Sequence, residues 1–127
     1  MQGYLLVFVG AGIGGALRHG VNLASERAFG PGFPWSTLAV NVVGSFAMGM
    51  LAGWLAVKAG AEWSQPVRLF LATGILGGFT TFSAFSLDAV LLWERGAKYA
   101  ALAYIGGSVA LSIGGLLLGL FLARHLA

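Results

Sequence analysis

Four long stretches of the sequence contain no Asp, Glu, Lys or Arg, and this pattern constrains the fold more than any other feature. They cover residues 1–17, 28–57, 69–87 and 99–123. A helix needs roughly 20 apolar residues to cross the hydrocarbon core of a bilayer. Charged residues make up 9% of the chain, whereas soluble domains carry about 25%. The pattern predicts an all-α integral membrane protein with four transmembrane helices, folded as a single domain over residues 1–127.

Charged and turn-forming residues set the approximate limits of these spans. We expect the spans to cover about residues 3–22, 35–57, 67–93 and 98–124. The expected connections are a loop that holds Glu26, Arg27, Pro31 and Pro34, a polar loop after residue 57, and a hairpin at residues 94–96.

Basic residues are almost equally divided between the two sides of the predicted bundle. If the N-terminus is cytoplasmic, the inner segments hold Lys58, Arg68 and Arg124, and the outer segments hold Arg18, Arg27, Arg95 and Lys98. Orientation normally follows an excess of Lys and Arg on the cytoplasmic side. A balanced chain can insert in both orientations, which permits an antiparallel homodimer. The scattered basic residues do not form the cluster that nucleic-acid binding requires.

Glycine pairs at GxxxG spacing occur in three of the predicted spans. They are Gly10–Gly14, Gly74–Gly78 and Gly115–Gly119. Small residues at this spacing let helix backbones approach closely in lipid. The three pairs predict a tightly packed bundle.

The third hydrophobic region contains a stretch that is poorly suited to a continuous lipid-facing helix. Residues 77–86 combine two adjacent glycines with four hydroxyl residues near the expected middle of the membrane. Irregular backbone at that depth is tolerated only where protein or a water-filled cavity surrounds it. Its free carbonyl groups can then bind a cation. We therefore predict a third helix that is broken near its middle, the alternative being a continuous helix with a glycine-rich packing face.

Two rows of uncharged hydrogen-bond donors flank this region. Thr37, Asn41 and Ser45 lie four residues apart in the second span, and Tyr104, Ser108 and Ser112 repeat that spacing in the fourth. Residues at this spacing share one helix face. Such side chains often join neighbouring membrane helices, but two parallel rows of donors also suit the path of an anion.

Acidic residues are nearly absent from the predicted span interiors. Asp88 lies well past the centre of the third region, and Glu26, Glu62 and Glu94 fall in predicted loops. Ionisable groups inside spans usually mark ion or proton pathways, so a proton-coupled exporter has little support. The absence of central Lys or Arg favours a channel, because a fixed positive charge would bind an anion too tightly for conduction.

Two phenylalanines, Phe82 and Phe85, lie three residues apart and can share one helix face. An aromatic ring is positive at its edge. The two ring edges can therefore contact a small anion while they exclude water. Lipid-facing packing is the alternative role of these side chains.

Three segments carry motifs of a known family. Residues 77–85 read GGFTTFSAF, residues 37–46 read TLAVNVVGSF, and residues 14–18 read GGALR. They resemble the GGxTTFSTF, GTLxVNxxGSF and, in shortened form, GGxxGAxxR segments of the Fluc, or CrcB-type, fluoride ion channel family. The resemblance covers three spans by motif. Ala84 departs from the family pattern by replacing Thr, and Ser36 departs from it by replacing Gly.

The resemblance implies a fluoride channel, not an enzyme, that exports fluoride passively across the bacterial cytoplasmic (inner) membrane and gives fluoride resistance. It implies a dual-topology antiparallel homodimer in membrane lipid, with a structural sodium ion at the dimer centre held by the backbone carbonyls of Gly77 and Thr80. The implied fluoride pore consists of Asn41, Phe82, Phe85, Tyr104, Ser108 and Ser112. The implied supports of the vestibule and the helix break are Arg18, Thr37, Thr81 and Ser83.

Two other functions remain open at this point. A small multidrug-type proton-coupled exporter shares the length, the four spans and the dual topology. It needs a glutamate in its first span, and residues 1–17 contain none. A non-transporting assembly subunit needs only the GxxxG surfaces.

Overall fold

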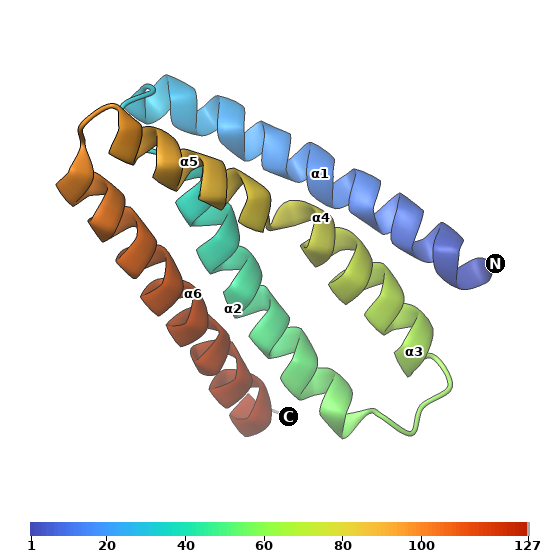
Figure 1. Ribbon diagram of the computed structural model, residues 1–127. Helices are drawn as coiled ribbons and strands as arrows, with labels where there is room; N and C mark the ends of the chain where they lie inside the picture. The colour runs from blue at the N-terminus through green and yellow to red at the C-terminus, as the bar shows by residue number, and fades with distance from the viewer. Residues whose placement is uncertain (127) are drawn as a thin grey trace.

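The computed structural model describes residues 1–126, and its regular elements are all helices (Figure 1). In chain order they are α1 (Gln2–Phe29), α2 (Trp35–Val57), α3 (Ser64–Val67), η1 (Arg68–Leu76), α4 (Gly77–Phe79), α5 (Phe82–Glu94) and α6 (Lys98–Leu126). Four segments are long and apolar enough to cross a membrane, namely α1, α2, the composite third span Ser64–Glu94, and α6. The predicted all-α class and the four spans are therefore confirmed.

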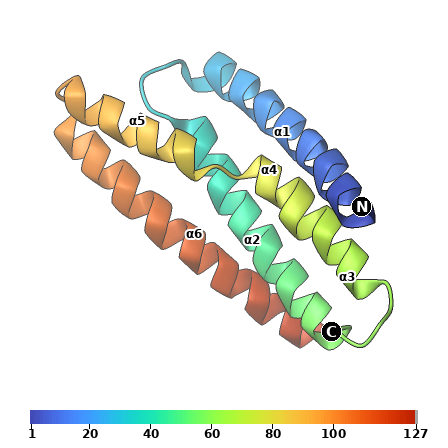
Figure 2. The ribbon, with the colours of Figure 1, turned by 45° about the vertical axis from the view of Figure 1, so that its right-hand side comes forward.

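The spans form two closely packed pairs. α2 packs mainly on α6, and α1 packs on η1 and α4. Figures 1 and 2 show that α1 and the third span run in one direction, whereas α2 and α6 run in the other. The third span passes from the α1 side of the bundle, through α4, to the α6 side, where α5 lies.

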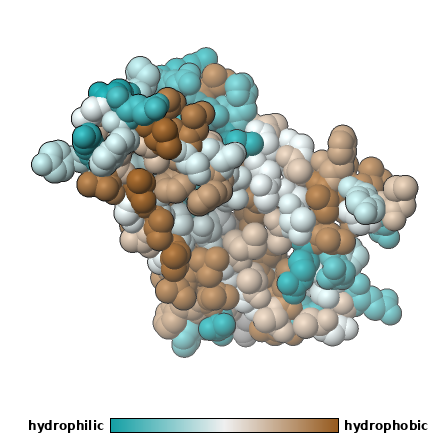
Figure 3. Space-filling model, in the orientation of Figure 1, coloured by the Kyte–Doolittle hydropathy of each residue, from teal (hydrophilic) through white to brown (hydrophobic). Residues whose placement is uncertain are grey.

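Large apolar side chains cover the outside of the bundle. Phe8 of α1 is 78% exposed and Phe121 of α6 is 56% exposed. In Figure 3 hydrophilic residues gather at the end that holds the α1–α2 and α5–α6 connections, and brown apolar residues extend over the surface below them. An apolar exterior between polar ends is the arrangement that a lipid bilayer requires.

The GxxxG pairs lie where helices meet. A Cβ atom added at Gly10 would lie 2.6 Å from the Phe70 carbonyl oxygen, and one added at Gly78 would lie 2.5 Å from the carbonyl oxygen of Ala11. A Cβ at Gly119 would lie 2.8 Å from the Met50 nitrogen. Because these neighbours are backbone atoms, only glycine allows the observed approach. The predicted tight packing is confirmed.

The third span is interrupted at two extended residues. Thr80 has φ −85° and ψ 158°, and Thr81 has φ −153° and ψ 119°. The interruption follows the adjacent Gly77 and Gly78, as predicted. The π-helical geometry of η1 before the break was not predicted. π segments are rare and occur frequently near functional sites.

The first helix is longer than the sequence suggested. We placed Glu26 and Arg27 in a loop, and this was wrong because both lie on α1. Glu and Arg favour helix, so their charge alone does not end one. The helix ends at Phe29, where Gly30 adopts a positive φ of 74° and Pro31 follows. Glycine adopts this conformation without the steric penalty that a side chain brings.

Candidate functional site

The interruption of the third span is held by Asn41 of α2. The Thr81 N–H donates to Asn41 Oδ1 at 2.8 Å, and Asn41 Nδ2 donates to the Thr81 carbonyl at 3.1 Å. One side chain thus satisfies both backbone groups of a residue that has left the helix. This pairing is needed because a buried backbone group without a partner is costly.

The carbonyl groups of residues 77–80 are released from the helical ladder at the break, and the Gly78 carbonyl accepts from Arg18 instead. In a continuous α-helix the Gly77 carbonyl would accept from the Thr81 N–H, and the Thr80 carbonyl would accept from the Ala84 N–H. Here the Thr81 N–H bonds to Asn41, and the Ala84 N–H bonds to Thr81 Oγ1 at 3.1 Å. Unwound carbonyls are suitable ligands for Na⁺. Gly77 and Thr80, which the family resemblance assigned to sodium, are among the residues with released carbonyls, so the residues present fit that ion.

Hydroxyl groups support both sides of the break. Thr81 Oγ1 caps α5 and lies 3.2 Å from Ser83 Oγ. Thr80 Oγ1 donates to the Leu76 carbonyl at 3.0 Å. A Cβ added at Gly44 of α2 would collide with Thr80 Cγ2. The Thr80 side chain therefore packs directly on the α2 backbone.

Arg18 of α1 reaches the same region. Its Nε donates to the Gly78 carbonyl at 3.1 Å, and the contact is half-buried. The sequence assigned Arg18 to support of a vestibule or the break, and its side chain lies against the break. The guanidinium thereby fixes α4 to α1, while Asn41 fixes the residue after the break to α2.

A groove of about 390 Å³ lies between α2, the break, α5 and α6. It brings together five of the six pore residues expected from the sequence: Asn41, Phe82, Phe85, Ser108 and Ser112. Ser45 and Met48 of α2 also line it. Most of its lining is apolar, and its polar groups come from α2, α6 and the break.

The two phenylalanines of α5 differ in their surroundings. Their ring centroids are 5.6 Å apart. Phe82 is 78% exposed, whereas Phe85 is half-buried and packs on Tyr104 with a centroid distance of 5.2 Å. Phe82 thus leaves most of its surface for another molecule to cover.

Tyr104, the sixth expected pore residue, does not line the groove. It is 1% exposed, and its hydroxyl donates to Asp88 Oδ2 at 3.2 Å. Thr37, which is also buried, donates to the same carboxylate oxygen at 2.7 Å. Asp88 therefore joins α2, α5 and α6 through two hydroxyl groups.

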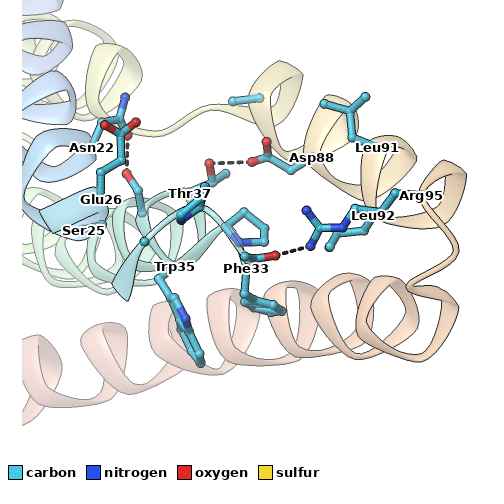
Figure 4. Close-up of a pocket in the computed structure, with 16 residues that line it drawn as sticks. Asn22, Ser25, Glu26, Phe33, Trp35, Thr37, Asp88, Leu91, Leu92 and Arg95 are labelled. Carbon is cyan, nitrogen blue, oxygen red and sulfur yellow. Dashed lines mark hydrogen bonds between the residues drawn. The ribbon is translucent and has the colours of Figure 1, made fainter. Parts of the chain in front are cut away.

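A second hollow of about 380 Å³ lies at the end of the bundle beside the α1–α2 connection. Thr37 and Asp88 line its floor, and Figure 4 shows the two side chains pointing toward each other. Ser36 donates to Asn22 at its rim, and Arg95 donates to the carbonyl of Gly32. The hollow therefore combines these polar contacts with apolar side chains such as Trp35 and Leu91.

The motifs predict no role for Asp88, although the sequence contains a signal of one. Asp88 and Tyr104 both lie eight residues from Gly96, on opposite sides of the α5–α6 hairpin. Residues that are equally distant from a tight turn lie side by side in antiparallel helices. The hairpin symmetry would therefore have paired the carboxylate with the tyrosine.

Known proteins share nearly the whole length of this chain. A family model described as CrcB-like protein, Camphor Resistance (CrcB), matches residues 5–120. The fluoride-specific ion channel FluC of Rhodopseudomonas palustris (strain BisB5) is 59% identical over 121 residues, which cover 95% of this chain and 96% of the relative. The FluC of Methylobacterium nodulans is 62% identical over 115 residues, covering 91% and 90%. The FluC of Beijerinckia indica subsp. indica is 55% identical over 127 residues, covering 100% of both chains.

Proposed function

The chain belongs to the CrcB family, and on that basis we propose that it is a fluoride-specific ion channel, not an enzyme. The observation that carries this proposal is the likeness to FluC channels over the full length of both chains. It favours a channel over the multidrug-type exporter and the non-transporting subunit. Passive export of fluoride across the cytoplasmic membrane of a bacterium would give the cell fluoride resistance.

The groove supplies the chemistry that a desolvated fluoride ion requires. Fluoride is small and strongly hydrated, and removing its water is costly unless other donors replace it. Asn41, Ser108 and Ser112 offer uncharged donors along the groove, and the ring edges of Phe82 and Phe85 offer positive electrostatic potential. Ser108 Oγ is buried and has no hydrogen-bond partner in the part of the chain that the structure describes. A buried donor without a partner is costly, so it suits a site where a passing anion accepts its hydrogen bond.

The hydroxyls of Thr37 and Tyr104 do not donate to fluoride in this proposal. Their donors are engaged by Asp88, so they shape the outer end of the path beside the hollow at the end of the bundle. Arg18, Thr81 and Ser83 support the break through the contacts described above. The positive charge of Arg18 also attracts anions toward this region.

A second copy of the chain completes the groove in this proposal. The exposed ring of Phe82 and the half-buried hydroxyls of Ser45 and Ser112 would otherwise face lipid, which cannot hydrogen-bond to the hydroxyls. The evenly divided basic residues permit the copy to insert in the opposite orientation. The proposed assembly is an antiparallel homodimer of one four-helix transmembrane domain per chain, in the inner membrane.

A sodium ion at the dimer centre fits the released carbonyls. Each chain would contribute the oxygens of Gly77 and Thr80, and the bound ion would supply a positive charge that stabilises the crossing of two broken helices. Asn41 engages the Thr81 N–H and Thr81 Oγ1 engages the Ala84 N–H, so that the Gly77 and Thr80 carbonyls remain available as ligands.

A growth assay tests the cellular role. Expression of the chain in a bacterium that lacks its own fluoride exporter is expected to restore growth in fluoride. Phe82→Ile should abolish the rescue, whereas Phe8→Ile should retain it, since both rings are 78% exposed but only Phe82 lines the groove. The absence of rescue by wild-type protein that is present in the membrane would contradict the proposed role.

A further inference from the structure

The polar side chains that line the groove fall into two groups, and the first group is already hydrogen-bonded within the protein. Thr80 Oγ1 donates to the Leu76 carbonyl at 3.0 Å. Thr81 Oγ1 accepts from the Ala84 N–H at 3.1 Å. Asn41 binds both backbone groups of Thr81 and keeps one amide hydrogen free. These side chains hold the break in place.

The second group consists of three serines, Ser45 of α2 and Ser108 and Ser112 of α6. Within residues 1–126 the hydrogen bonds that side chains make include none to these three hydroxyls. A serine in a helix commonly donates to the carbonyl four residues earlier. Ser86 does this toward Phe82 at 2.9 Å. The three groove serines therefore have free donors where Ser86 does not.

Glycine contacts hold the helices that carry these serines close together. A Cβ at Gly115 would lie 3.4 Å from the Val42 carbonyl oxygen, and one at Gly119 would lie 2.8 Å from the Met50 nitrogen. These contacts lie on both sides of Ser45 along α2. The part of α2 that carries Ser45 is thereby fixed against the part of α6 that carries Ser112.

The hydroxyls at the outer end of the path have no such freedom. Thr37 and Tyr104 both donate to Asp88. Each hydroxyl has one hydrogen to give, so neither can donate to an anion while that contact persists. The groove hydroxyls that make no hydrogen bond within the described residues are those of the three serines, whereas Thr81 Oγ1 accepts from the Ala84 N–H and lies 3.2 Å from Ser83 Oγ.

We propose that Ser45 donates a hydrogen bond to permeating fluoride from α2, opposite the donors of α6. This inference rests on the proposed channel function and adds a donor to its path. An anion in the groove then exchanges water for hydroxyl groups of both α2 and α6. Because no serine carries a charge, the ion is bound without being retained.

The chain contains no cysteine, so a single Ser45→Cys substitution places one thiol in the groove. Silver ions are small and bind thiolates, and silver nitrate added to proteoliposomes is expected to block fluoride efflux through this variant. The matched control is Val43→Cys, two residues away on α2, where the side chain is 56% exposed and does not line the groove. Silver should leave wild type and Val43→Cys unaffected.

Removal of the hydroxyl tests donation itself. Ser45→Ala should slow fluoride efflux about tenfold, because one hydrogen bond to an ion is lost, while Ser45→Thr should retain most of the rate. Ser86→Ala is the control, since its hydroxyl is bonded to its own helix. The thermal midpoint of Ser45→Ala in detergent should equal that of wild type. If Ser45 had only a structural role, its removal would lower the midpoint.

The outcomes separate this inference from the function on which it rests. Wild-type rates in Ser45→Ala overturn the inference, whatever silver does to the cysteine variant. A slow Ser45→Ala with a lowered thermal midpoint and a silver-insensitive Ser45→Cys also overturns it. If wild-type protein releases no fluoride, the channel function itself fails.

Discussion

Asn41 and Thr81 are 40 positions apart in the chain and form a reciprocal pair of hydrogen bonds, 2.8 Å and 3.1 Å long. The side-chain amide of Asn41 donates and accepts as a backbone peptide group would, and it pairs with the extended residue that interrupts the third span. The pairing allows a broken helix to exist at membrane depth, because both groups of the freed peptide unit have partners.

Asn41→Asp should weaken the break. A carboxylate keeps an acceptor for the Thr81 N–H but cannot donate to the Thr81 carbonyl, so the free energy of unfolding should fall by about 1–3 kcal/mol. Thermal unfolding in detergent measures the effect. Asn22→Asp is the control, because Asn22 only accepts from Ser36 and a carboxylate preserves that contact. Equal midpoints for the two variants would contradict the role given to Asn41.

Asp88→Ala should destabilise the joint between α2, α5 and α6. The change leaves the buried hydroxyls of Thr37 and Tyr104 without their acceptor, at an expected loss of about 1–3 kcal/mol for each group that stays unpaired. Asp88→Asn keeps one oxygen acceptor and should recover part of the stability. Comparison of the two thermal midpoints tests this, and an Asn variant that is no more stable than the Ala variant would argue against acceptance by Asp88.

Gly10→Ala should prevent close packing of α1 on the third span. Its Cβ would meet the carbonyl oxygen of Phe70 at 2.6 Å, and a backbone atom cannot rotate away. Overpacking of this kind typically costs about 1–3 kcal/mol. Gly12→Ala is the control, because nothing lies within 4 Å of a Cβ at that position. Both variants are compared by thermal unfolding, and similar losses in the two would show that packing on η1 is not the cause.

Sodium removal should destabilise the protein if Gly77 and Thr80 hold the ion. A ligand that binds only the folded state raises stability with its concentration. The thermal midpoint should therefore be higher in sodium chloride than in the chloride salt of N-methylglucamine, an organic cation too large for a carbonyl site. The shift should rise with sodium concentration and saturate. Identical midpoints in the two salts would remove the basis for the sodium site.

Hydropathy predicted the number of spans and both ends of α2 at Trp35 and Val57, because membrane thickness and the flanking prolines and charges determine these features. The break was predictable because Gly77, Gly78 and the following hydroxyl residues disfavour a continuous helix. These properties are local and can be found along the sequence.

The contacts that make the break stable could not be predicted in the same way. The bonds from Asn41 to Thr81 and from Arg18 to Gly78 join different spans, and they depend on how the helices are rotated and displaced against each other. The engagement of Tyr104 by Asp88 depends on the register of the α5–α6 hairpin. Residue spacing placed Tyr104 with the serines on one helix face, and its pairing with Asp88 becomes evident only when the α5–α6 hairpin is taken as symmetric about Gly96.

Fluoride efflux from liposomes that contain the purified protein tests the central claim most directly. A fluoride electrode and a matched chloride measurement should record rapid fluoride release without chloride release. Phe82→Ile and Phe85→Ile should slow fluoride release, while Phe8→Ile should leave it unchanged. Folded, reconstituted protein that releases no fluoride, or that releases chloride as fast as fluoride, would contradict a fluoride-specific channel.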